Sequence, residues 1–176
     1  MSRQRLQMNH EHIAACFNAC FEDPEMTTLI GGSAEPLYLP GDGKELARLY
    51  YREDYAASAL HEIAHWCIAG RDRRGREDFG YQYTPPPRTA QQQDKFFALE
   101  CRTQALESIF AEAAGLQFRV SADNLNADVA EFAQVVRQMV PRVRHWMLES
   151  ADSRARTFAQ ALAAWPRCDS GDAVNG

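Results

Sequence analysis

The chain has 176 residues, of which 45% are hydrophobic and 24% charged, and its formal net charge at pH 7 is −5. These values predict one ordinary globular domain, and the negative charge argues against general nucleic-acid binding. The first twelve residues contain no apolar run, and no later stretch approaches the roughly 18 apolar residues of a membrane span. We therefore expect a cytoplasmic protein without a direct nucleic-acid or membrane partner.

The N-terminal part predicts one helix and two strands. Residues 9–22 have the spacing of an amphipathic helix, and Cys16 and Cys20 fall on its apolar face as core residues. The five cysteines show no C-x-x-C spacing, which indicates neither a disulfide framework nor a zinc ribbon. Residues 36–40 predict an edge strand framed by prolines, and residues 49–51 a second strand. Residues 79–83 alternate aromatic positions and predict a third strand or a binding loop, ended by the prolines at 85–87.

A metal-binding pattern lies in the next predicted helix, over residues 55–69, with Asp54 as its expected cap and Gly70 as its C-terminal glycine. His61 and His65 are four residues apart with Glu62 between them, so both imidazoles share one face and can bind one metal ion. The alternative is a surface helix with two solvated histidines. The apolar residues around the motif favour a buried helix, in which polar side chains need partners.

A long predicted helix over residues 89–114 supplies a third ligand. Glu100, Gln104 and Glu107 form a polar stripe on its otherwise apolar surface. We expect Glu100 to complete the metal site, with Glu107 as the alternative; Glu100 could instead pair with a cation such as Arg102. Further helices are predicted over residues 129–146, kinked at a proline, and 153–164. The expected domain covers residues 1–166, and residues 167–176 are expected to be a disordered tail.

Two histidines and one carboxylate suit two chemistries. Zinc hydrolysis would use Glu62 as a general base on a metal-bound water, and an Fe(II) site would activate oxygen. Ile68 and Arg71 stand where a longer protease signature requires Gly and His, which weakens one protease interpretation but leaves a zinc metallopeptidase with a glutamate ligand open. An arginine cluster follows the motif and is either a solvated loop or a basic rim for an anionic macromolecule: Arg71, Arg73, Arg74, Arg76 and, further on, Arg88.

The chain resembles the bacterial elongation factor P hydroxylase family from about residue 10 to residue 165. The stretches that carry the resemblance are residues 36–40, 55–70, 78–83, 100–107 and 121–125. The resemblance implies a helix-rich α+β fold with a small sheet and the metal site on a central helix. That fold would be zincin-like and similar to a metal-dependent endoribonuclease of ribosome maturation.

The resemblance also implies a monooxygenase-type hydroxylation of the modified lysine of elongation factor P, an acidic protein, normally after β-lysylation. His61, His65 and Glu100 match a 2-His-1-carboxylate triad, which raises Fe(II) above zinc, with O2 as co-substrate and an unknown electron donor. Glu62 would orient a neighbouring group or handle protons. Six residues are expected to bind substrate: Arg71, Arg73, Arg74, Tyr81, Tyr83 and Gln104.

Overall fold

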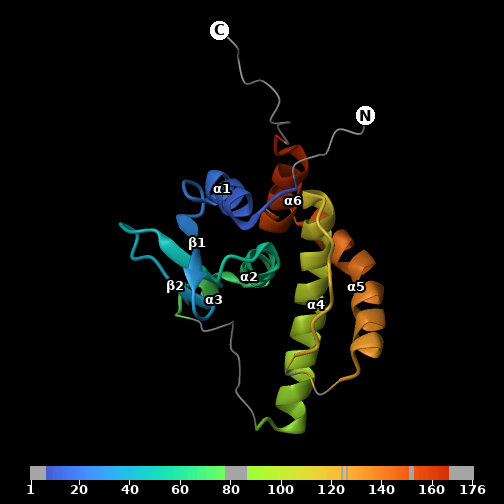
Figure 1. The fold of residues 1–176 in the computed structure, drawn as a ribbon. Helices are drawn as coiled ribbons and strands as arrows, with labels where there is room; N and C mark the ends of the chain where they lie inside the picture. Colours follow the sequence, from blue (N-terminus) through green and yellow to red (C-terminus); the bar gives the residue numbers. More distant parts are fainter. Residues whose placement is uncertain (1–6, 78–86, 124, 126, 151–152, 167–176) are drawn as a thin grey trace, which may run out of the picture.

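The computed structural model describes residues 7–77, 87–123, 125, 127–150 and 153–166. Its elements, in chain order, are α1 (His10–Phe21), β1 (Thr27–Ser33), β2 (Leu37–Leu39), β3 (Ala47–Arg52), α2 (Ala56–Ile68), α3 (Arg71–Arg74), α4 (Ala90–Ala114), α5 (Val129–Glu149) and α6 (Arg154–Ala164). Figure 1 shows the sheet on one side of α2 and the α4–α5 pair on the other. The predicted helix-rich α+β class is therefore confirmed.

The sheet has the order β1-β3-β2, with β1 parallel and β2 antiparallel to the central β3. The predicted strands at 36–40 and 49–51 correspond to β2, at an edge, and β3. Strand β1 is not predicted by its sequence, because it contains Gly31 and Gly32, and glycines usually interrupt strands. Here they form an irregularity in the pairing with β3. A Cβ on Gly31 would lie 2.4 Å from the Tyr51 hydroxyl, so this close approach requires glycine.

Helix α2 lies at the centre of the molecule, with α1 and α6 above it in the view of Figure 1. Trp66 is fully buried, and its ring centroid lies 5.0 Å from that of Phe17 and 4.9 Å from that of Phe21. Phe158 of α6 joins the same cluster through Phe17 and Phe110. Eight of the 13 residues of α2 are buried, so its histidines are carried by a well-packed helix.

The helix predicted at 55–69 is found at Ala56–Ile68, but both of its predicted caps were wrong. The helix begins after Tyr55, not Asp54, and Tyr55 makes no side-chain capping bond. Gly70 is extended, with φ −70° and ψ 171°, and precedes the short helix α3 instead of closing α2 in a left-handed turn. The reason is Arg154, whose Nη2 donates to the carbonyls of Trp66, Cys67 and Ala69 at 3.1, 3.1 and 2.8 Å. The Arg154 guanidinium therefore binds the free carbonyl groups at the C-terminal end of α2, where a glycine motif was expected.

The long helix α4 has clear end signals. Thr89 and Gln92 form a capping box at its start, and Gly115 ends it with φ 71°. Helix α5 continues through Pro141, as expected, and α6 matches the helix predicted at 153–164. Across the described residues, none of the helices is both long and apolar enough to span a membrane. The predicted strand at 79–83 and the predicted tail lie outside the described residues.

Cys16 and Cys20 pack in or against the core, as predicted for this face of α1. The two thiols share a hydrogen bond and titrate together. The hydrogen bond with Cys20 and partial burial raise the pKa of Cys16. For Cys20, the hydrogen bond with Cys16 outweighs the effect of burial and lowers the pKa to about 7. Cys67 on α2 is buried, and that burial raises its pKa to about 12. Cys20 is therefore the reactive thiol of the three.

Candidate metal centre

Two packed helices, α2 and α4, bring the predicted metal ligands together. His61 and His65 lie one turn apart on α2, and Glu100 and Glu107 lie two turns apart on α4. His65, Glu100 and Glu107 are buried, at 4%, 8% and 7% exposure. The His61 side chain keeps 27% of its surface accessible, so the centre is open to solvent on the His61 side.

Three side chains that can bind a metal ion converge between α2 and α4. The Nε2 atoms of His61 and His65 are 3.1 Å apart, and Glu100 Oε1 lies 3.1 Å from His65 Nε2. Glu100 Oε2 lies 3.7 Å from His61 Nε2. One ligand atom from each of these residues lies within 4.8 Å of the others, an arrangement able to hold a metal ion. Two imidazoles and one carboxylate suit Zn²⁺ or Fe(II) and leave coordination positions for substrate.

The hydrogen bonds around the histidines fix which nitrogen faces the centre. Thr103 Oγ1 donates its proton to the Leu99 carbonyl at 2.9 Å, so it can only accept from His65 Nδ1, 3.3 Å away. His61 Nδ1 likewise donates to Glu107 Oε2 at 2.8 Å. Both Nδ1 atoms therefore carry protons, which directs the Nε2 atoms inward as ligands.

The electrostatics of the centre favour bound positive charge. Burial lowers the pKa of His61, but the hydrogen bond and charge of Glu107, with the charges of Glu100 and Glu62, raise it to about 10. Burial lowers the pKa of His65, aided by the charges of His61 and Arg73. Burial raises the pKa of Glu100, but His65 and His61 outweigh it and bring it to about 2. A metal ion would therefore have to displace the proton that His61 carries below its raised pKa.

Gln104 joins the centre to the segment that follows α4. Its Nε2 donates to the Ser121 carbonyl at 2.7 Å and to Glu100 Oε2 at 3.3 Å, and its Oε1 accepts from the Ser121 amide at 3.1 Å. These bonds use both donors of a side chain that is 3% exposed. Gln104 thus supports Glu100, and its predicted contact with substrate stays a prediction.

The remaining predicted site residues have different surroundings. Glu62 is buried at 5% exposure, one residue from His61. In α3, Arg71 is exposed and Arg73 is close enough to influence the pKa of His65. Arg74 instead pairs with Glu25 at 2.9 Å, and its carbonyl accepts a hydrogen bond from the Tyr38 hydroxyl. These contacts give Arg74 a role in holding the fold together, and its predicted contact with substrate stays a prediction. Tyr81 and Tyr83 lie outside the described residues.

Thr103 is the supporting residue that the sequence analysis missed. Glu100, Thr103, Gln104 and Glu107 follow the i, i+3, i+4, i+7 spacing of one helix face. All four are buried against the centre. That spacing was the available signal, but a buried threonine is common in helices and its role became visible only through its two hydrogen bonds.

Comparisons with known proteins identify the family of this chain. The family model described as "Elongation factor P hydroxylase" matches residues 16–172. A protein of Haemophilus influenzae named elongation factor P lysine hydroxylase is 41% identical over 156 residues, which cover 88% of each chain. Both matches include α2, α4 and all the residues that converge between them. The chain belongs to the elongation factor P hydroxylase family.

Proposed function

We propose that this protein is a metal- and oxygen-dependent hydroxylase of the modified, β-lysylated lysine of elongation factor P. The observation that carries the proposal is the convergence of His61 Nε2, His65 Nε2 and the Glu100 carboxylate in a member of this family. Family membership favours hydroxylation over hydrolysis by a zinc metallopeptidase. The reaction would take place in the cytoplasm, where translation factors act.

His61, His65 and Glu100 would hold the metal, and Fe(II) is the ion that best fits this donor set in a hydroxylase. When bound, Fe(II) supplies the activation of O2, with electrons from a donor still to be identified. Glu107 and Thr103 keep both Nε2 atoms directed at the ion through the Nδ1 bonds. Glu107 would thus orient His61 through its Nδ1 hydrogen bond, and Glu100 would be the carboxylate ligand.

The protein substrate would reach the centre from the accessible side of His61. We assign Glu62 to proton handling beside the reacting carbon, because it is buried next to a metal ligand. Arg71 and Arg73 are proposed to contact the substrate protein, and Tyr81 and Tyr83 to contact the aliphatic, cationic lysyl side chain, in part by cation–π attraction. Gln104 would act mainly by holding Glu100 and Ser121, and its contact with substrate remains a prediction.

Intact-mass spectrometry of elongation factor P tests the proposal. Protein reconstituted anaerobically with Fe(II) and then exposed to O2 and a reductant should add one oxygen atom to the modified lysine. His65→Ala should abolish the addition, and His145→Ala, an exposed histidine of α5, should leave it unchanged. No added oxygen with the Fe(II) protein, or peptide cleavage by a zinc-loaded protein that Glu62→Gln abolishes, would overturn the assignment.

A further inference from the structure

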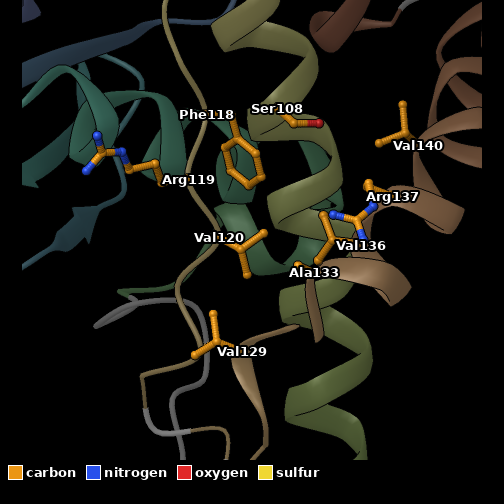
Figure 2. Close-up of a pocket in the computed structure, with 9 residues that line it drawn as sticks. All are labelled: Ser108, Phe118, Arg119, Val120, Val129, Ala133, Val136, Arg137 and Val140. Carbon is orange, nitrogen blue, oxygen red and sulfur yellow. The ribbon is translucent and has the colours of Figure 1, made fainter. Parts of the chain in front are cut away.

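An apolar groove lies outside the metal centre, between α4, α5 and the extended segment 116–121. Its volume is about 490 Å³, within the roughly 300–1,000 Å³ range of ligand sites. In Figure 2, Val136 and Val140 of α5 face Phe118 and Val120 of the segment across the groove, with Val129 at one end. Val129 is 56% exposed, so part of this apolar surface is open to a partner.

The charge of the groove differs from that of the whole chain. Of its nine lining residues, Arg137 on α5 is the basic one on the groove side, Arg119 points away from the groove (Figure 2), and none of the nine is acidic. The chain as a whole has 24 acidic and 19 basic residues. Arg142 and Arg144 lie farther along α5 and are exposed, although Arg144 pairs with Glu112. An apolar groove with Arg137 beside it and Arg142 farther along the same helix is complementary to an apolar side chain next to a carboxylate.

The groove and the metal centre share the segment 116–121 as a wall. Phe118 and Val120 face the groove, whereas Figure 2 shows Arg119 pointing to the opposite side of the segment. At the end of the segment, Ser121 is bound by Gln104, which also holds Glu100. A protein that covers the groove would therefore lie next to the metal centre.

The metal centre by itself offers little surface for recognising a protein. Its ligands His65 and Glu100 are buried, and only His61 is partly accessible. We propose that the groove is the docking site for an acidic, partly apolar surface of the substrate protein, remote from its lysine. This inference rests on the proposed function, because it takes elongation factor P as the partner.

Charge-changing variants at the groove test the inference. Arg137→Glu removes a basic lining residue, and Val129→Asp places a carboxylate at the first position of α5, where helix N-termini favour negative charge. Arg48→Glu, at an exposed position of β3, makes the same charge change on the opposite side of the molecule (Figure 1). Circular dichroism and the melting temperature of each variant show that the fold is kept.

Two measurements separate docking from chemistry. Both groove variants should weaken binding of purified elongation factor P, and raise its KM, by about tenfold, with kcat unchanged. They should turn over a short peptide carrying the modified lysine as well as the wild type does, and Arg48→Glu should behave as wild type in every assay. The difference in affinity for elongation factor P between the wild type and the groove variants should become smaller at high ionic strength.

The outcomes distinguish this inference from the proposed function. Equal binding of elongation factor P by wild type and both groove variants would overturn the docking site, whether or not oxygen is added. A different result would support the docking site and overturn the hydroxylase assignment. In that case the wild type binds elongation factor P but adds no oxygen to it, and the groove variants lose the binding. Equal losses with intact protein and with peptide would also overturn docking at the groove.

Discussion

Replacing Thr103 with valine isolates the contribution of one supporting hydrogen bond to the metal centre. Thr103 is fully buried, and valine replaces its hydroxyl by a methyl group of similar size, so the lost hydrogen bonds are the main change. The His65 Nδ1 proton then has no acceptor from Thr103, and the Leu99 carbonyl loses its hydroxyl donor. His65 would gain by moving its proton to Nε2, which would remove the lone pair that faces the centre.

The size of the effect follows from the geometry. A buried polar group left without a partner costs about 1–3 kcal/mol, and the lower end applies because the His65–Thr103 contact is long, at 3.3 Å. Loss of a partner behind a metal ligand commonly weakens metal binding about 10–100-fold, and for the same reason we expect about tenfold. Anaerobic calorimetric titration with Fe(II) measures the affinity, and urea unfolding of the metal-free protein measures the stability.

Two controls decide whether the hydroxyl is responsible. Thr103→Ser keeps the hydroxyl and should bind Fe(II) much as the wild type does. Thr28→Val removes an exposed hydroxyl that donates to Glu22, and it should leave Fe(II) affinity unchanged. Wild-type Fe(II) affinity in Thr103→Val, or equal losses in Thr103→Val and Thr103→Ser, would refute the reasoning about the His65 tautomer.

Three further predictions use other contacts. Glu107→Gln keeps an acceptor for His61 but removes a charge, so Fe(II) affinity measured by calorimetry should fall about tenfold; an unchanged affinity would exclude this supporting role. Arg154→Met removes the guanidinium from the end of α2 and should lower the free energy of urea unfolding by about 2 kcal/mol, whereas equal stability would show that solvent replaces it. Cys20, with its pKa of about 7, is mostly thiol below that pH and mostly thiolate above it, so iodoacetamide labelling followed by peptide mass mapping should be half-maximal near neutrality; Cys67, at about 12, should stay unlabelled there, and the reverse order would contradict the assignment.

The sequence predicted those parts of the fold that depend on local periodicity. The helices at 9–22, 89–114 and 153–164, and the strand ending in Tyr51, lie close to where they were expected. It failed where a distant residue decides the local conformation. The end of α2 depends on Arg154, and β1 tolerates two glycines because Tyr51 packs over Gly31. Neither partner can be identified from nearby sequence.

The metal centre shows the same limit. The spacing of His61 and His65 indicated a shared helix face, and the polar stripe on the long helix indicated a facing carboxylate. Spacing alone could not separate Glu100 from Glu107, because both lie on that stripe. The structure distinguishes them by the nitrogen that each approaches, since Glu100 faces Nε2 of His65 and Glu107 bonds Nδ1 of His61. The role of Gln104 likewise depends on Ser121, beyond the end of the helix.

The separation of the ligands along the chain has a kinetic consequence. His61 and His65 precede residues 69–89, and Glu100 follows them, so all three meet only after α4 has docked against α2. Docking closes a long loop, and its entropic cost is met before any ion can be coordinated by the full set. If α4 docks against α2 only after the folding transition state, a bound metal stabilises the native state and not the transition state. It should slow unfolding in stopped-flow experiments and leave the refolding rate unchanged, so that a chelator alters the lifetime of the fold and not the speed of its formation.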